Sequence, residues 1–285
     1  MKELGVWVRK YPDLYTGNSF LQYLSRGTND PVRHLSFSFS HVTDDQNSHA
    51  RLEAVKAFAT LLSKDAFITN ARTNIMRISS RLIEISLRDV DVNVRINALK
   101  ALALLDKTGV LQDEDDDQRN RVVRVVFDQE PRVRRAVGEF VKGLLAEKVE
   151  GLESTWSAVK GTKKKRGSKI SEKDMRTFLG WKALASMLVE TYRDLDSREA
   201  GTSTAPSVPV SVSMGRATAA VEALRGSIEG LSEWHELVDY LLLDHSTGDQ
   251  DMWLLEDEEE DFMIQVLIAC IKADASEDVS RHRVN

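Results

Sequence analysis

The stretch that decides the fold is Asp89-Val90-Asp91-Val92-Asn93-Val94-Arg95-Ile96-Asn97-Ala98. An Asp stands six residues before an Arg, and apolar residues follow the Arg at +3, +7 and +10, namely Ala98, Leu102 and Leu105. Spacings of three and four residues bring side chains to one face of an α-helix. The stretch therefore predicts a turn followed by an amphipathic helix.

The same pattern occurs twice more without gaps, at residues 45–54 with Arg51 and at residues 128–137 with Arg134. The intervals between the three arginines are 44 and 39 residues. Periods of about 40–47 residues are typical of HEAT and armadillo arrays. We therefore expect an all-α fold, a HEAT-like helical repeat solenoid (α-α superhelix). The Asp is expected to cap or brace the turn, and the Arg to bridge to the Asp of a neighbouring repeat.

Further helices are predicted around these repeats. Partner helices precede the second and third copies, and four more helices follow in the second half; these six segments are residues 68–87, 119–127, 174–192, 214–228, 231–243 and 257–272. The last of them has a broad apolar face of Phe262, Ile264, Val266, Leu267, Ile268 and Ile271. The predicted organisation is HEAT repeats over 1–150, a basic linker over 151–172, and further helical repeats over 173–285 with a disordered loop at 197–212.

Composition limits the class of protein. Hydrophobic residues make up 42% and charged residues 29% of the 285 residues, and no apolar run reaches the roughly 18–20 residues of a membrane span. Cys270 is the one cysteine, which excludes an intramolecular disulfide and favours a reducing intracellular compartment. From residue 190 onward seven basic residues stand against twenty-one acidic ones, so the first part of the chain is basic and the last part acidic.

Motifs for catalysis are missing from the sequence. The six histidines have no metal-ligand spacing, and there is no Gly-rich phosphate loop, no G-x-S-x-G sequence and no cysteine pair. The acidic run at 114–117 lacks the glycine and the spaced ligands of a calcium loop, and it stands where carboxylates favour a helix start. We therefore expect no enzyme activity, no cofactor, no metal and no small-molecule substrate.

Basic residues are the candidates for contact with double-stranded DNA. Arg77, Arg81 and Arg88 lie on one side of a predicted helix, and Arg132 and Arg135 follow in the third repeat, where they suit phosphate contact. The alternative is that such arginines are merely solvated, while Arg95 and Arg134 are internal braces. The run Lys163-Lys164-Lys165-Arg166 is typical of a nuclear localisation patch or a DNA-touching loop, with a plain solvated loop as the alternative.

An ordered set of segments runs through most of the chain. The segments are Glu3-Leu4-Gly5-Val6-Trp7, Tyr11-Pro12-Asp13, Tyr23-Leu24, Arg77-Ile78-Ser79-Ser80-Arg81-Leu82-Ile83-Glu84, Leu105-Asp106-Lys107-Thr108-Gly109-Val110-Leu111, Phe127-Asp128-Gln129-Glu130-Pro131-Arg132-Val133-Arg134, Glu233-Trp234-His235-Glu236, Tyr240-Leu241-Leu242-Leu243-Asp244-His245 and Glu258-Glu259-Glu260. In this order they resemble one family, the stromalins (stromal antigens), which are HEAT-repeat subunits of cohesin, and the fit looks fungal.

This resemblance implies a hook-shaped, non-catalytic scaffold that acts in the nucleus on chromatin, in sister chromatid cohesion and chromosome segregation. It implies binding to the kleisin subunit of cohesin and to DNA, and docking of the cohesin loader or regulators through short aromatic peptides. Tyr23 and Arg77 are the matching positions for such a peptide. Trp181, Trp234 and Trp253 are candidates for the kleisin groove, although aromatics at helical spacing are more often core residues.

Two departures from the family pattern stand out. The chain begins inside the conserved domain, which suggests a fragment or a truncated gene model, and residues 27–44 form an irregular insertion that fits no repeat. The aromatic residue expected near position 26 for peptide docking is missing. The competing interpretation is another HEAT-repeat scaffold, of the transport-receptor or phosphatase-scaffold type, without DNA binding. An enzyme would need titratable residues that converge in a cleft.

Overall fold

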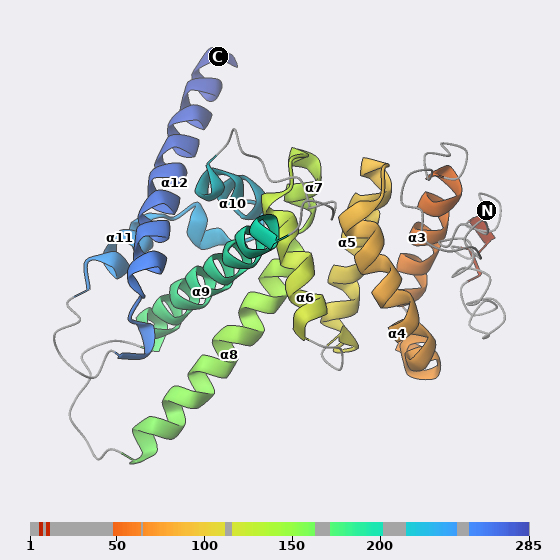
Figure 1. Ribbon diagram of the computed structural model, residues 1–285, viewed down its shortest axis with the longest axis horizontal. Helices are drawn as coiled ribbons and strands as arrows, with labels where there is room; N and C mark the ends of the chain where they lie inside the picture. The colour runs from red at the N-terminus through yellow and green to blue at the C-terminus, as the bar shows by residue number, and fades with distance from the viewer. Residues whose placement is uncertain are drawn as a thin grey trace. The chain divides into compact units, whose positions relative to one another are not determined.

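The computed structural model describes residues 6, 7, 10, 11, 48–63, 65–111, 116–162, 172–201, 215–243 and 251–284 (Figure 1). It divides into two compact units, Met1–Val125 and Val126–Asn285. The described part of each unit consists of packed helices, as the all-α helical-repeat prediction required.

The first unit is built on α3 (Ser48–Leu62), α4 (Asp65–Arg88), α5 (Val92–Lys107) and α6 (Asp116–Val123). Helix α5 packs against both α3 and α4, and α6 packs against α4 (Figure 1). Each buried leucine, isoleucine or phenylalanine side chain contributes about 1.5–3 kcal/mol by leaving water. The buried side chains between these helices include Val55, Phe58, Leu61, Ile75, Leu82, Leu99, Leu102 and Leu105.

The turn between α4 and α5 is held by the Asp of the repeat pattern. The Asp89 carboxylate accepts a hydrogen bond of 2.9 Å from the Asp91 amide. Asp91 is the N-cap of α5 and accepts from the amides of Asn93 and Val94. These acceptors satisfy amides that the first turn of a helix leaves without partners. The prediction that the Asp braces the turn is confirmed here.

The predicted bridge between neighbouring repeats is also present. Arg51 on α3 donates from Nε and Nη2 to the two carboxylate oxygens of Asp89, at 2.7 and 2.9 Å, and both side chains are largely buried. Such a bidentate pair fixes orientation as well as distance. The arginine of the second repeat, Arg95, donates from Nε to the Ser86 carbonyl near the end of α4, at 2.9 Å. Arg95 therefore satisfies a carbonyl in the last turn of α4, where intrahelical donors are missing.

The second unit follows the short helix η4 (Arg124–Phe127) and contains α7 (Pro131–Ala136), α8 (Gly138–Thr162), α9 (Glu172–Gly201), α10 (Arg216–Leu224), η5 (Glu229–Leu231), α11 (His235–Leu241), η6 (Asp251–Trp253) and α12 (Asp257–Val284). Helix α10 packs between α7 and α12, while α9 packs against α8, α11 and α12 (Figure 1). Phe140, Leu184, Leu237 and Phe262 are among the buried side chains of this unit.

The third repeat copies the turn of the second. The Asp128 carboxylate accepts from the Glu130 amide at 2.9 Å, and Glu130 caps α7. Arg134 is buried and donates from Nη1 to the carbonyls of Asp128 and Gln129, at 2.6 and 3.0 Å. Its Nη2 is paired with Glu222 on α10. The arginine of this repeat thus reaches the next helix pair through a Glu instead of the Asp of the pattern.

Two helices extend beyond the ends that the sequence predicts. Helix α8 continues to Thr162, so residues 151–162 are helical instead of a linker, and α9 continues to Gly201, so any loop begins later than residue 197. The two compact units divide at Val125 and not near residue 150. The insertion predicted at 27–44, and the remaining parts of the linker and loop at 163–171 and 202–212, lie outside the described residues.

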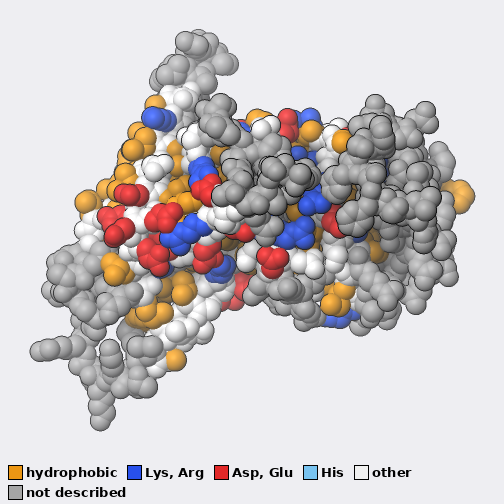
Figure 2. Space-filling view, viewed as in Figure 1, with side chains coloured by type: hydrophobic (Ala, Val, Ile, Leu, Met, Phe, Trp, Pro, Cys, Tyr) orange, Lys and Arg blue, Asp and Glu red, His pale blue; other side chains and the backbone are white. Residues whose placement is uncertain are grey.

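The apolar face predicted for residues 257–272 is divided between two sides of α12. Phe262 and Val266 are buried together with Met263, Ala269 and Cys270. Ile264, Ile268 and Ile271 are 41%, 46% and 42% exposed, and their spacing of four and three residues forms one line, here called the isoleucine stripe. Hydrophobic side chains are visible along the outer edge of α12 in Figure 2. The helix presents apolar residues to two sides, of which its own unit covers one.

We expect a double-mutant cycle with Arg51→Gln and Asp89→Asn to give a coupling energy of about 1–3 kcal/mol, because both charges are largely buried and each loses its partner. Urea denaturation followed by circular dichroism provides the measurement. Arg81 and Glu84 form a matched control, since this pair spans 2.7 Å but is more exposed and should couple by less than about 0.5 kcal/mol. Equal coupling energies in the two cycles would contradict the structural role of Arg51.

Candidate functional site

The arginines predicted for DNA contact on α4 are only partly open to solvent. Arg88 is exposed, and Arg81 is half-buried, with its Nη1 2.7 Å from the Glu84 carboxylate. Seven residues separate the two, so they lie on one face of α4. The pairing with Glu84 reduces the positive charge that Arg81 offers to a phosphate. The side chain of Arg77 lies outside the described residues, as does the run Lys163-Lys164-Lys165-Arg166.

Helix α7 separates surface arginines from a buried one. Arg132 and Arg135 are exposed, whereas Arg134 between them is 1% exposed. Arg95 of the second repeat is also buried, at 9%. The division of the arginines into internal braces and surface residues therefore agrees with the sequence. Contact of the surface arginines with DNA stays a prediction.

The tryptophans proposed for a kleisin groove are mostly core residues. Trp181 and Trp253 are 4% and 2% exposed, so neither side chain lines an open groove in this structure. The Tyr240 hydroxyl donates to the Trp253 carbonyl at 2.6 Å, and the Trp181 ring packs against Gly230. Trp234 is half-buried, and its indole N–H donates to Asp274 at 2.5 Å. The core interpretation, left open by the sequence, holds for Trp181 and Trp253.

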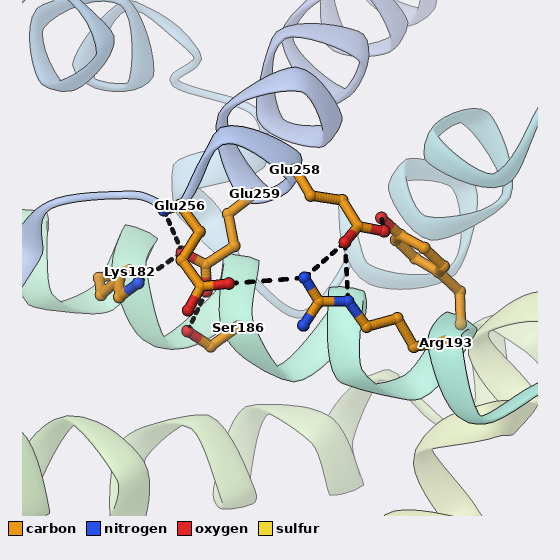
Figure 3. A network of polar contacts seen from close by, with 7 residues as sticks. Lys182, Ser186, Arg193, Glu256, Glu258 and Glu259 are labelled. Atoms are coloured by element: carbon orange, nitrogen blue, oxygen red, sulfur yellow. Dashed lines mark hydrogen bonds and ion pairs between the residues drawn. The ribbon is translucent and has the colours of Figure 1, made fainter.

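A polar network that the sequence did not indicate joins α9 to the start of α12 (Figure 3). Glu258 accepts hydrogen bonds from Arg193 and from the Tyr192 hydroxyl, the latter at 2.6 Å. Glu259 is almost fully buried and accepts from Lys182 and from the Ser186 hydroxyl, the latter at 2.5 Å. Two consecutive carboxylates thus attach α12 to about three turns of α9.

Glu259 also caps the helix that carries it. Its carboxylate accepts from the Glu256 amide at 2.8 Å, three residues back, in the manner of the Glu in a capping box. The carboxylates of the first turn, Asp257 to Glu260, favour the positive end of the helix dipole. The acidic run before an apolar helix was noticed in the sequence, but only the structure shows that its second Glu points inward.

The charges of this network shift the pKa of both carboxyls. The Arg193 and Tyr192 hydrogen bonds lower the pKa of Glu258 below its ordinary value. Burial alone raises the pKa of Glu259, but the hydrogen bonds from Lys182, Ser186 and the Glu256 amide outweigh it and lower the pKa. Both groups are therefore held as carboxylates by their donors, as expected for ion pairs that stabilise a helix contact.

A cavity of about 710 Å³ lies among α7, α10 and α12, here called the α10 pocket. Three cationic side chains and one carboxylate line it, together with three hydroxyls and small apolar residues. The lining residues are Arg135, Thr218, Val221, Glu222, Arg225, Gly226, Ser232, Ala269, Lys272, Ala273 and Ser276. The walls of this pocket come from three separate segments, namely Arg135, residues 218–232 and residues 269–276. No local pattern in the sequence relates these segments.

Three further features of the described residues concern metal binding, membrane insertion and thiol chemistry. No group of three or more His, Cys, Asp or Glu side chains there is arranged to hold a metal ion. None of the described helices combines the length and the apolar character needed to cross a bilayer. Cys270 is buried, and this burial raises the pKa of its thiol to about 11, which leaves very little reactive thiolate at neutral pH.

Comparison with known proteins shows which proteins this chain is similar to. No protein-family model matches the sequence. The chain is 26% identical over 156 residues to the cohesin subunit psc3 of Schizosaccharomyces pombe, covering 55% of this chain and 14% of that protein. It is 26% identical over 156 residues, or 54% of this chain, to sister-chromatid cohesion protein 3 of Arabidopsis thaliana. It is 24% identical over 135 residues, or 46% of this chain, to the cohesin subunit SCC3 of Saccharomyces cerevisiae. The chain is thus similar to these three proteins over about half of its length.

The relationship to these cohesin subunits covers only part of each of them. The matches span 14%, 12% and 10% of the three relatives, so this chain corresponds to a short portion of each protein. The family resemblance predicted from ordered motifs is confirmed by the three matches. The helical-repeat fold agrees with it, because the described residues form stacked helix pairs with a repeated turn.

We expect Glu259→Gln to weaken the fold at neutral pH and to have little effect in acid. The lowered pKa of Glu259 means that the unfolded chain binds more protons, so its stabilisation is complete above the ordinary value of 4.5 and disappears as pH falls. The variant should lose about 2 kcal/mol at pH 7, the contribution of hydrogen bonds to a charged group. Its free energy of unfolding should then depend less on pH below 4.5.

The control is Glu260→Gln, which removes an exposed carboxylate from the same helical turn. Chemical denaturation at pH 3, 5 and 7 compares the two variants with the native chain. A Glu259→Gln variant as stable as Glu260→Gln at pH 7 would show that the network of Figure 3 does not hold α12 in place.

Proposed function

We propose that this chain is a non-catalytic helical-repeat scaffold of a cohesin complex, which acts on chromatin in the nucleus and serves sister chromatid cohesion and chromosome segregation. The observation that carries the proposal is the match to three proteins named for cohesin or for sister-chromatid cohesion. The stacked helix pairs support it, because such arrays offer long surfaces to partner chains. In this role the scaffold binds the kleisin subunit and double-stranded DNA.

The isoleucine stripe of α12 is the surface that best suits a kleisin helix. Ile264, Ile268 and Ile271 are each more than 40% exposed and follow one line along the helix. An amphipathic helix recognises such a line through apolar residues at matching spacing. The exposed carboxylates of Asp257, Glu260 and Asp261 lie at one end of α12. They favour a partner helix with basic residues at the corresponding end.

The isoleucine stripe can be tested by calorimetric titration of the chain with the central segment of the kleisin from the same organism. We expect saturable binding, weakened at least about tenfold by Ile268→Glu, since a buried isoleucine contributes about 1.5–3 kcal/mol to a contact. The exposed position should leave the helicity and Tm of the chain almost unchanged.

Gln265→Glu is the matched control, because it places the same new charge on an exposed polar position of α12. Equal binding by Ile268→Glu and the native chain would exclude the isoleucine stripe. Failure of the native chain to bind any kleisin segment would favour another kind of HEAT scaffold.

For DNA, the exposed arginines of α7 are the strongest candidates among the described residues. Arg132 and Arg135 are both exposed, and they belong to the basic part of the chain before residue 190. Each phosphate that an arginine neutralises releases counterions, so binding weakens as salt rises. Arg81 and Arg88 on α4 are weaker candidates because Arg81 is paired with Glu84. Arg77 and the run 163–166 remain candidates from the sequence.

We expect Arg132→Gln with Arg135→Gln to weaken binding of a short DNA duplex and to reduce the slope of log affinity against log salt by about 1–2. Fluorescence anisotropy at several salt concentrations gives both quantities.

Lys100→Gln with Lys107→Gln removes the same charge from exposed positions of α5 and should leave the slope nearly unchanged. An equal loss in both double variants would reduce the DNA contact to overall charge. No salt-dependent binding at all would favour a transport-receptor or phosphatase-scaffold type of protein.

Docking of the cohesin loader or of regulators through aromatic peptides stays a proposal from the family resemblance. Tyr23 and the side chain of Arg77, the two positions that match the family, lie outside the described residues. The isoleucine stripe and the surface arginines do not depend on this activity.

A further inference from the structure

The α10 pocket brings Arg135, from the basic part of the chain, together with two cations of the acidic part. Arg135, Arg225 and Lys272 contribute positive charge to its walls, against the single carboxylate of Glu222. From residue 190 onward the chain otherwise carries three times as many acidic as basic residues. A local excess of positive charge in such surroundings requires a physical explanation, since like charges repel each other at close range.

The acidic groups at the pocket are already engaged by other cations. Glu222 is paired with the buried Arg134, and Asp274, next to the pocket, is paired with Arg225 and accepts from the Trp234 indole at 2.5 Å. These pairs hold Arg225 in the wall and leave little negative charge to attract the remaining cations. Glu222 and Asp274 therefore belong to the framework of the pocket.

Two cations on opposite helices remain for a ligand. Arg135 on α7 donates from Nε to the neutral carbonyl of Pro131, at 3.3 Å. Lys272 on α12 forms no ion pair with any residue that the structure describes. Both line the pocket, and both are exposed. An anionic group in the pocket can thus meet a guanidinium from one wall and an ammonium from another.

The size and the remaining lining indicate what carries that anion. A cavity of about 710 Å³ is within the usual range for small ligands and short peptide segments. The hydroxyls of Thr218 and Ser232 supply further hydrogen-bond donors, whereas that of Ser276 already donates to the Lys272 carbonyl at 2.8 Å. Val221, Ala269 and Ala273 provide small apolar surfaces beside them. We propose that the α10 pocket binds a short extended peptide segment of a partner protein that carries Asp or Glu next to small apolar residues.

The surrounding charges favour a peptide over nucleic acid. The first turn of α12 exposes Asp257, Glu258, Glu260 and Asp261, and Glu233 and Asp239 are exposed in the same unit. A DNA duplex carries one negative charge for about every 1.7 Å of its axis, so it would bring many phosphates past these carboxylates. A short segment with one or two carboxylates avoids that repulsion.

Gly226 offers a way to block the pocket without changing its charge. It lines the cavity, and a Cβ added there meets nothing within 4 Å, so a larger side chain enters open space. Gly226→Met should therefore fill the pocket and keep the fold. Lys272→Gln removes one of the two available cations from an exposed position. The two variants act on the pocket by different means, namely volume and charge.

The test uses the whole chain and two immobilised hexapeptide libraries. One has two fixed glutamates, and the other has glutamines at the same positions. We expect the native chain to select glutamate peptides rich in Ala and Val, and the best of these peptides, labelled with fluorescein, to bind at least about tenfold more weakly to Lys272→Gln and to Gly226→Met. Lys142→Gln is the control, because Lys142 is exposed on α8 and does not line the pocket. Thermal melting followed by circular dichroism confirms that each variant is folded.

Three results would overturn the proposal. These are no preference for glutamate over glutamine, unchanged binding by both folded pocket variants, or an equal loss in Lys142→Gln. Displacement of the peptide by an equimolar DNA duplex would assign the pocket to nucleic acid instead. The pocket and the isoleucine stripe are tested with different ligands and different variants. A failure of the kleisin test can therefore be told apart from a failure of the pocket proposal.

Discussion

A buried arginine that must find acceptors outside its own helix is the constraint on which the repeats depend. A guanidinium removed from water is tolerated only when its donors are satisfied. Arg51 meets this demand with the Asp89 carboxylate of the next repeat, and the two terminal nitrogens of Arg134 meet it with two turn carbonyls and with Glu222 on α10. Because Asp89 and Glu222 stand on later helix pairs, these arginines set how closely and in what register neighbouring helices pack.

The sequence predicted this part of the fold well because its signals are local. In each copy of the repeat, the Asp, the Arg and the apolar positions after it lie within about twenty residues of one another. Helical geometry converts this spacing directly into a turn and a packed face. The helix ends differed from the prediction where distant contacts outweigh local composition. The end of α8 falls in the predicted linker, yet Trp156 within it packs against the buried Trp253 with tilted rings whose centroids are 6.2 Å apart. A contact across almost a hundred residues leaves no local signal.

The candidate sites were predictable to a smaller degree for the same reason. Exposed Arg132 and Arg135 could be told from buried Arg134 by the repeat pattern, whereas the burial of Trp181 and Trp253 depends on which neighbours α9 and η6 meet. The isoleucine stripe was contained in the predicted apolar face of α12, but only packing shows which isoleucines stay outside. The α10 pocket combines Arg135 with Lys272, and no spacing in the sequence relates them.

The bidentate pair of Arg51 and Asp89 also determines how the first unit responds to bending. A contact that depends on two aligned hydrogen bonds at 2.7 and 2.9 Å weakens steeply once the partners move or tilt, unlike an apolar surface, which can slide. Helices joined in this way resist small deformations and then give way abruptly. The boundary between these two repeats is therefore stiffer toward small displacements than an apolar contact of the same size.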